Sequence, residues 1–211
     1  MDANAWDARY EEALLVWSPS ANVWVEEVVS GLGPGTALDV AAGEGRNAFW
    51  LVERGWRVHA TDFSTTAVRR MESLADERLA PSARPHLTTA VADAVQDAPA
   101  AAAYSLVLVS YLHLPAPDLR RALAHAVEAL EPGGALVVVG HARRNVEEGV
   151  GGPQDPAVLY GPDDLVAALD GLPVRVVSAD ERERAVEGHE RPALDTVVVA
   201  ERLPGDGPGR D

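Results

Sequence analysis

The stretch that decides the fold is TALDVAAGEGRN, residues 36–47. Its apolar half ends in Asp39, and its small residues lead into AFWLV at 48–52, where the composition predicts a helix. Small residues let the backbone approach a ligand closely, and a helix N-terminus presents N–H groups that have no partner within the helix. The stretch therefore predicts a strand, a glycine turn and a helix that together bind a ligand.

A second acid follows at the distance expected for a nucleoside ligand. The short strand predicted at 56–60 leads to Thr61 and Asp62, about twenty residues after the glycine turn. An acid at the end of this second strand can accept hydrogen bonds from the two hydroxyls of a ribose. We therefore expect a ligand that contains a nucleoside.

Two familiar nucleotide-binding loops fit the turn less well. The dinucleotide fingerprint places a third glycine where this chain has Arg46, and that glycine permits tight packing of the helix on the strand. A Walker loop requires a lysine, and the sequence contains none. An NAD(P)-dependent oxidoreductase remains an alternative, although Arg46 and the lack of a Tyr-x-x-x-Lys pair weigh against it. A regulatory protein that binds the cofactor without turnover is a second alternative.

Composition limits the partners and the chemistry. The chain has 211 residues, of which 47% are hydrophobic and 24% charged, as in an ordinary globular domain. The net charge of −15 argues against nucleic acid or anionic membranes as partners. Cysteine is absent and the six histidines form no paired zinc motif, so no metal site is expected.

The cellular location is predicted from the lack of a membrane-spanning stretch and of a secretory signal. No stretch approaches the ~20 apolar residues that span a bilayer, and the N-terminal region is acidic rather than basic and then apolar, unlike a secretory signal. We therefore expect a cytoplasmic protein. The absence of both lysine and isoleucine suggests a GC-rich bacterial genome.

The order of the predicted elements indicates an α/β fold. Strand-like and helix-like segments alternate from the glycine turn to about residue 142, which is the pattern of a doubly wound, mostly parallel sheet. Two late strands without a helix between them predict an antiparallel pair at the C-terminal end of the sheet. Seven strands are expected, at 36–40, 56–60, 87–92, 104–110, 135–139, 174–177 and 195–200. Helices are expected after Ser64, at 118–130 and at 163–170.

We expect a single domain at 1–203, followed by a mobile Gly- and Pro-rich tail at 204–211. Within that domain, residues 1–33 would form helices over the ligand, and 34–203 would form the α/β core. The irregular segment at 143–162 interrupts the alternation, and long loops of this kind are often functional.

The combined motifs resemble the class I S-adenosylmethionine-dependent methyltransferases over about residues 5–203. The resemblance rests on the glycine turn, the apolar strand followed by YLHLP at 111–115, the LEPGG turn at 130–134 and the final strand pair. The motif GEGRNA at 43–48, with Gly55-Trp56 and Asp62-Phe63-Ser64, is similar to the motifs of one branch of this family, the tellurite-resistance and thiopurine-type small-molecule methyltransferases. This Rossmann-like family implies methyl transfer to a small molecule by direct in-line displacement, with S-adenosylmethionine converted to S-adenosylhomocysteine.

The resemblance also implies a set of cofactor-binding residues. Asp62 would accept from the ribose hydroxyls, Phe63 would lie on the adenine, and Asp93 with the Ala94 amide would contact the adenine edge. Arg9 could pair with the methionine carboxylate, and Trp17 could lie near the sulfonium. The expected set is completed by the turn residues Asp39, Ala41, Gly43, Gly45 and Asn47 and by Ser110 at the end of the central strand.

The acceptor site is expected at the carboxyl ends of two neighbouring strands. Tyr111 and His113 follow the strand predicted at 104–110, and His141 follows the next strand. These three residues are the candidate catalytic groups, with His113 favoured as general base if the acceptor is a hydroxyl. Candidate substrate contacts are Tyr10, Trp17, Tyr111 and Arg144.

Overall fold

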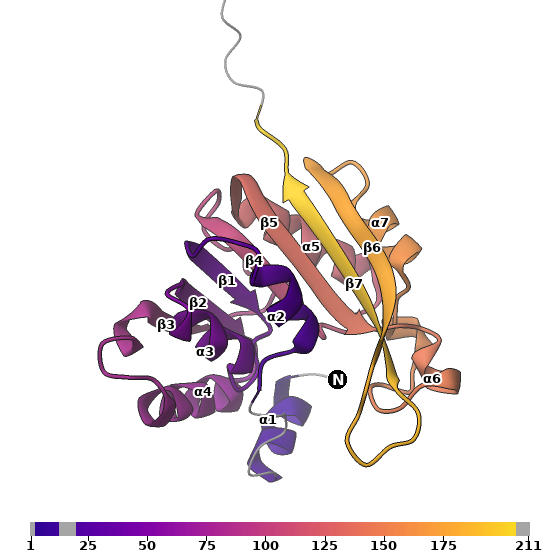
Figure 1. The fold of residues 1–211 in the computed structure, drawn as a ribbon, viewed down its shortest axis with the longest axis horizontal. Coiled ribbons are helices and arrows are strands. Elements are labelled where there is room, and N and C mark those ends of the chain that lie inside the picture. Colours follow the sequence, from indigo (N-terminus) through magenta and orange to yellow (C-terminus); the bar gives the residue numbers. More distant parts are fainter. Residues whose placement is uncertain (1–2, 13–19, 206–211) are drawn as a thin grey trace, which may run out of the picture. The chain divides into compact units, whose positions relative to one another are not determined.

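The computed structural model describes residues 3–12 and 20–205, with residues 3–5, 9 and 12 described by their backbone alone. The chain divides into two compact units, residues 1–98 and 99–211 (Figure 1). The seven strands follow the order β3-β2-β1-β4-β5-β7-β6. No helix among the described residues is long and apolar enough to cross a membrane.

The first unit is built on three parallel strands. Its strands are β1 (Thr36–Val40), β2 (Arg57–Asp62) and β3 (Leu87–Val91), with β2 paired to both neighbours. Its helices are α1 (Ala3–Glu12), α2 (Val23–Val29), α3 (Arg46–Glu53), α4 (Thr65–Arg78) and the 3-10 turn η1 (Arg84–His86). Leu38, Leu51 and Met71 are fully buried and join the sheet to α3 and α4 as one apolar core.

Helix α4 begins where the sequence predicts it. The hydroxyl of Ser64 accepts a hydrogen bond from the backbone N–H of Ala67, which satisfies one of the unpaired donors of the first turn. Asp7 from α1 accepts from the Ser64 hydroxyl and from the backbone N–H of Thr66. The hydrogen bond from Ser64 holds the pKa of Asp7 below its usual value. Helix α1 is thereby tied to the start of α4.

The second unit is a mixed four-stranded sheet. Its strands are β4 (Tyr104–Ser110), β5 (Leu130–His141), β6 (Val174–Arg184) and β7 (Ala193–Arg202), with β4 and β5 parallel and β7 antiparallel to both β5 and β6. Its helices are α5 (Ala116–Ala129), α6 (Asn145–Glu148) and α7 (Pro162–Leu169), with the 3-10 turn η2 (Pro156–Val158). Strands β4, β5 and β7 hold nearly continuous buried valines and leucines, as expected of central strands.

The predicted fold class is confirmed, including the antiparallel pair near the C-terminus. The boundaries differ most at two strands. Strand β6 continues to Arg184, beyond the apolar run that predicted it at 174–177, and β5 includes the Pro132–Gly134 turn. The segment at 143–162 contains α6 and η2. The single-domain boundary at 203 stays a prediction.

Candidate functional site

The glycine turn after β1 is held in the left-handed region of backbone space. Ala41 has φ of 55°, Gly43 has 58° and Gly45 has 85°. A Cβ on Gly45 would lie 2.6 Å from Cγ of Met71 and 2.9 Å from Cζ of Phe49, so only glycine fits there. Ala41, where the motif of the resembled methyltransferase family has a glycine, adopts the left-handed conformation despite its side chain.

Asp62 links this turn to the end of β2. One carboxylate oxygen accepts from the backbone N–H of Gly43 and the other from the backbone N–H of Ser64, both at 2.9 Å. Burial raises the pKa of Asp62, while these two hydrogen bonds oppose the rise. Each oxygen retains a lone pair, so the fixed carboxylate can still accept from two neighbouring hydroxyls of a ligand.

Asp39, near the end of β1, is an unsatisfied buried acid. Its side chain is fully buried, and among the described residues neither carboxylate oxygen has a hydrogen-bond partner with full geometry. Burial raises its pKa to about 7, an effect that the charge of Arg46 and, slightly, the backbone N–H of Ala48 oppose and the charge of Asp62 reinforces. Such a group is satisfied by a ligand that brings a hydrogen-bond donor or a positive charge. Together, Asp39 and Asp62 fit a ligand that combines ribose hydroxyls with a cationic part.

Other residues of the expected cofactor set have structural partners. The Asn47 side chain accepts from the backbone N–H of Asn22 at 2.9 Å, which joins the start of α2 to α3. Asp93 accepts from the backbone N–H of Val95 at 2.8 Å, within the turn that follows β3. Phe63 lies half-buried directly after β2.

The N-terminal candidates are only partly described. Trp17 and the side chain of Arg9 lie outside the described residues. Tyr10 is buried in α1, where its ring lies 5.7 Å from that of Trp6 and its backbone carbonyl accepts from Arg70. Tyr10 therefore packs as part of the first unit.

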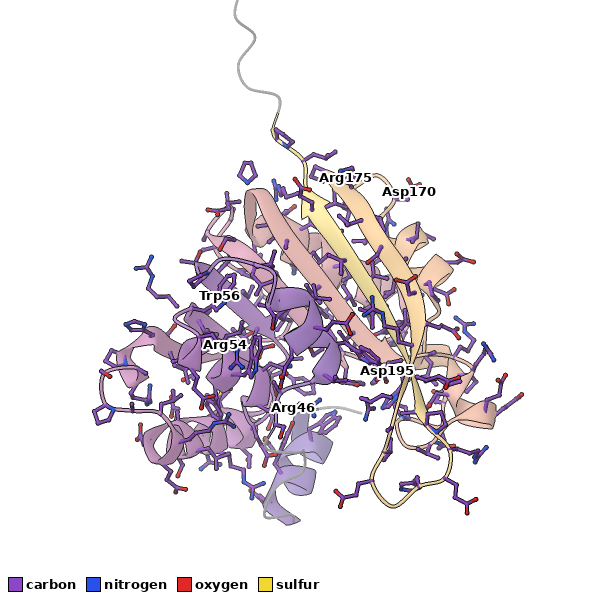
Figure 2. All side chains as sticks on the ribbon, viewed as in Figure 1. Arg46, Arg54, Trp56, Asp170, Arg175 and Asp195 are labelled. Atoms are coloured by element: carbon purple, nitrogen blue, oxygen red, sulfur yellow. The ribbon has the colours of Figure 1, made fainter. Side chains whose placement is uncertain are left out.

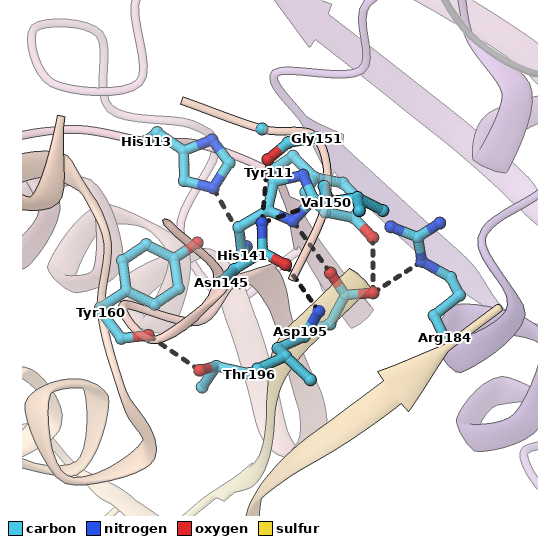
Figure 3. A network of polar contacts seen from close by, with 12 residues as sticks. Tyr111, His113, His141, Asn145, Val150, Gly151, Tyr160, Arg184, Asp195 and Thr196 are labelled. Carbon is cyan, nitrogen blue, oxygen red and sulfur yellow. Dashed lines mark hydrogen bonds and ion pairs between the residues drawn. The ribbon is translucent and has the colours of Figure 1, made fainter. Parts of the chain in front are cut away.

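In the second unit, the three candidate catalytic residues lie together (Figure 3). Ring centroids are 5.0 Å apart for Tyr111 and His141, 5.5 Å for His113 and His141, and 6.0 Å for Tyr111 and His113. Tyr111 has φ of 58°, a conformation that is rare and strained for a bulky side chain. Ser110, immediately before it, has a buried hydroxyl with no hydrogen-bond partner among residues 3–12 and 20–205.

Sequence reasoning missed the acid at the centre of this cluster. Asp195 of β7 is fully buried, and its Oδ2 accepts from the Tyr111 hydroxyl at 3.0 Å and from Nε of Arg184 at 2.7 Å. Its Oδ1 lies 3.2 Å from Nδ1 of His141. That approach is bent rather than in line, so it is an ion-pair contact without full hydrogen-bond geometry. The signal available in the sequence was an acid that opens an otherwise apolar strand.

His113 is held as a hydrogen-bond acceptor. Its Nε2 lies 3.1 Å from the backbone nitrogen of His141 and accepts that N–H. Burial lowers the pKa of His113 to about 3, with a further lowering from His141 and a partial opposition from Asp195. His113 is therefore neutral at ordinary pH, and its proton is on Nδ1.

The segment after β5 covers the cluster. Asn145 is buried, donates to the carbonyls of Val150 and Gly151, and accepts from the backbone N–H of Leu194 on β7 at 2.7 Å. A Cβ on Gly152 would lie 2.4 Å from Cδ2 of His141. The backbone at residues 150–152 is thus fixed against the His141 ring.

Arg144 lies outside the cluster in this structure. Its exposed guanidinium pairs with Glu148 and, at 3.1 Å, with Glu181. Among the described residues, no group of three or more histidine, aspartate or glutamate side chains is arranged to hold a metal ion.

Two comparisons with known protein sequences match parts of this chain. Residues 37–134 match a family model described as a methyltransferase domain. A stretch of 129 residues, 60% of this chain, is 36% identical to part of the probable non-canonical nonribosomal peptide synthetase CymA of Salinispora arenicola. The matched stretch spans only 2% of that protein.

Solved structures share the fold. A protein described in connection with the conversion of a disulfide bond into a thioacetal group during echinomycin biosynthesis matches with a TM-score of 0.73 and 20% identity, over 95% of this chain and 92% of that one. The 1,6-didemethyltoxoflavin-N1-methyltransferase of Burkholderia thailandensis, with bound S-adenosylhomocysteine, matches with a TM-score of 0.71 and 18% identity, over 96% and 87%. At these identities the likeness establishes the fold.

Residues 37–134 thus match a methyltransferase-domain model, and the seven strands have the order and the antiparallel C-terminal pair of the class I methyltransferase fold.

Proposed function

We propose that the protein transfers a methyl group from S-adenosylmethionine to a small-molecule acceptor by direct in-line displacement. The observation that carries this proposal is the pair of buried acids in the first unit. Asp62 is fixed by two backbone N–H groups, whereas the Asp39 carboxylate has no hydrogen bond of full geometry within the described part of the chain. When bound, S-adenosylmethionine supplies a methyl group on a positively charged sulfur. The protein then has to bind, orient and exclude water, which can provide about 7–11 kcal/mol of barrier reduction in favourable cases.

The cofactor roles that we propose follow the order of the elements. Ala41, Gly43 and Gly45 let the backbone approach the ligand, and Asp62 accepts from the ribose hydroxyls. Phe63, Asp93 and Ala94 would hold the adenine. The remaining proposed contacts are Arg9, Trp17, Asp39, Asn47 and Ser110, although the Asn47 carbonyl oxygen already has a backbone partner.

For the acceptor, we propose that the cluster of Tyr111, His113 and His141 supplies the catalytic groups. Because Nε2 of His113 already accepts a backbone N–H, His141 is better placed than His113 to take a proton. Tyr10, Trp17, Tyr111 and Arg144 remain the proposed substrate contacts. For Arg144, contact with an anionic acceptor would require exchange of its bonds to Glu148 and Glu181.

The tellurite-resistance and thiopurine-type branch remains a prediction from the motif wording, as do a cytoplasmic location in a bacterium and the absence of nucleic-acid and membrane partners. The rival activities are an NAD(P)-dependent oxidoreductase and a regulatory protein that binds the cofactor without turnover. Arg46 at the third-glycine position continues to weigh against the oxidoreductase.

Calorimetry on the full chain separates these activities. Binding of S-adenosylmethionine and S-adenosylhomocysteine without binding of NAD is the expected result, and NAD binding without either sulfur ligand would overturn the proposal. Turnover is then measured with methyl-labelled cofactor and a panel of phenols, thiols, amines and chalcogen oxyanions. Binding without label transfer to any acceptor would favour the regulatory role.

A further inference from the structure

We propose that Asp195 positions His141 as the proton acceptor for a hydroxyl-bearing acceptor such as a phenol or enol. This inference rests on the proposed function and deepens it, because it assigns a pair of residues and a substrate class to the acceptor site. Asp195 acts through His141 and is therefore a positioning residue, whereas His141 would touch the reacting hydroxyl.

Strand register brings the two residues together. His141 ends β5 and Asp195 lies near the start of β7, and the two are direct partners across the antiparallel pair. Partners of this kind project to the same face of the sheet. The resulting 3.2 Å contact between Oδ1 of Asp195 and Nδ1 of His141 selects the tautomer with its proton on Nδ1. Nε2 is then left as the basic nitrogen.

Asp195 is itself fixed in its ionised form. Burial alone would raise the pKa of Asp195, but the contacts from His141 and Arg184 outweigh burial and hold that pKa below its usual value. Arg184 supplies the compensating positive charge from β6, and the Tyr111 hydroxyl supplies a third contact. A buried carboxylate with three partners on three different segments is a rigid support for the imidazole.

The same geometry assigns His141 rather than His113 as the base. Both rings are stacked with an interplanar angle of 12°, but only His141 faces a carboxylate. His113 uses Nε2 as an acceptor from the His141 backbone and has its proton on Nδ1, so neither nitrogen can receive a proton without loss of that bond.

The proton transfer balances without a further reactant. The acceptor O–H breaks, its proton passes to Nε2 of His141, and the oxygen retains the electron pair with which it attacks the methyl carbon. His141 is then an imidazolium, paired with the Asp195 carboxylate, and returns the proton to solvent after release. An acceptor already ionised in water, such as a thiolate, has no need of this step. The pair therefore points to hydroxyl acceptors.

The first experiment reads the tautomer directly. The charged and titratable groups around His141 are Asp195 on β7, Arg184 on β6, Tyr111 and His113 after β4, and Tyr160 before α7. Nitrogen NMR of the full chain should show neutral His141 with its proton on Nδ1, and Asp195→Asn should abolish this preference. A wild-type ring with its proton on Nε2 would overturn the proposal.

The second experiment measures rate with S-adenosylmethionine and the panel of phenols and thiols. For phenols, His141→Gln should lower kcat roughly 10²–10⁴-fold, and Asp195→Asn should lower it roughly tenfold or more. For thiols, both losses should be much smaller. Equal losses for the two acceptor classes, or an unchanged kcat for phenols in folded Asp195→Asn, would refute the assignment.

A matched control comes from the same two strands. Glu201 of β7 pairs with Arg175 of β6 at 2.6 Å, as Asp195 pairs with Arg184, but this pair is exposed and lies at the other end of the strands (Figure 2). Glu201→Gln should leave kcat and the His141 tautomer unchanged. If Asp195→Asn does not fold, Arg184→Gln removes the charged contact to Oδ2 of Asp195 while the carboxyl group stays in place, and a smaller loss of kcat for phenols than in Asp195→Asn is expected.

Different measurements distinguish a failure of the methyltransferase assignment from a failure of the Asp195–His141 proposal. Absence of binding of S-adenosylhomocysteine to the wild-type chain contradicts the methyltransferase assignment, whereas the His141 tautomer is measured without any ligand. An intact cofactor affinity in Asp195→Asn, with reduced transfer to phenols, is the result that supports both.

Discussion

At the scale of single residues, three buried aspartates have three different electrostatic states. Asp62 is held by two backbone N–H groups, and Asp195 is held by an arginine, a tyrosine and a histidine. Neither oxygen of Asp39 has a hydrogen bond of full geometry to any residue that the structure describes. A buried carboxylate is stable as an ion only when such contacts replace its hydration. The three aspartates therefore differ in how strongly the folded chain stabilises the ionised carboxylate.

Asp62 holds two backbone N–H groups of the fold and is also the proposed acceptor for the ribose hydroxyls, and substitution can separate these two contributions. Asp62→Ala removes the acceptors for the Gly43 and Ser64 N–H groups as well as the expected acceptors for the ribose, so both stability and affinity should fall, each by about 1–3 kcal/mol. Asp62→Asn keeps the shape and one acceptor oxygen and should preserve more of both. Urea unfolding and calorimetry with S-adenosylhomocysteine give the two quantities. Unchanged affinity in folded Asp62→Ala would place the ribose elsewhere.

Asp39 makes stability depend on pH. Because its folded-state pKa is raised to about 7, the unfolded chain releases this proton first as pH rises. Its contribution should therefore decrease from about pH 4 to about pH 7, by up to roughly 1.4 kcal/mol per pH unit, and be constant above that window. Asp39→Asn lacks this titration. The free energy of unfolding of the wild-type chain should fall relative to the variant across the window, and parallel curves would show that the carboxyl is ionised in the folded chain.

At the scale of elements, the segment after β5 is fixed at Gly152. Gly151 and Gly152 have nearly equal φ, 73° and 75°, so alanine at either position should cost about 1–2 kcal/mol of left-handed strain. Only at Gly152 would the new Cβ also meet the His141 ring. Urea unfolding should show Gly152→Ala to be the less stable variant. Equal stability would mean that the segment moves away from His141 at little cost.

The elements also show what the sequence could predict. The apolar runs that became β1, β4 and β7 were visible as strands because burial on both faces requires continuous valine and leucine. The sequence predicts strand β6 only to Val177, because most of its remaining residues are charged and the strand lies at an edge of the sheet, where no apolar run is required.

The site could be predicted only in part for the same reason. The glycine turn and Asp62 lie within one local motif, so their juxtaposition follows from the sequence. Asp195 meets His141 through strand register, with 53 residues between them in the chain, and the orientation of His113 depends on a single backbone N–H. Such long-range contacts leave no local pattern in the chain.

At the scale of the whole molecule, ligand binding should stabilise the fold. A ligand that binds only the folded chain stabilises it by about 2.7 kcal/mol at 100 times its Kd, which for a chain of this size is roughly 5–11 °C in Tm. We expect this increase with S-adenosylhomocysteine and no increase with NAD at the same concentration. Scanning calorimetry provides the measurement, and a larger increase with NAD would exclude the cofactor assignment.

The position of β7 between β5 and β6 has a consequence for synthesis. The ribosome makes the strands in order of sequence, so β5 and β6 are complete before β7, which pairs with both of them, has emerged. Until then each has an open edge, and the His141 ring has no carboxylate beside it. A nascent chain that stalls before Ala193 would thus present two unpaired strand edges and an incomplete proposed acceptor site. Folding of the second unit therefore waits for almost the last residues that the structure describes.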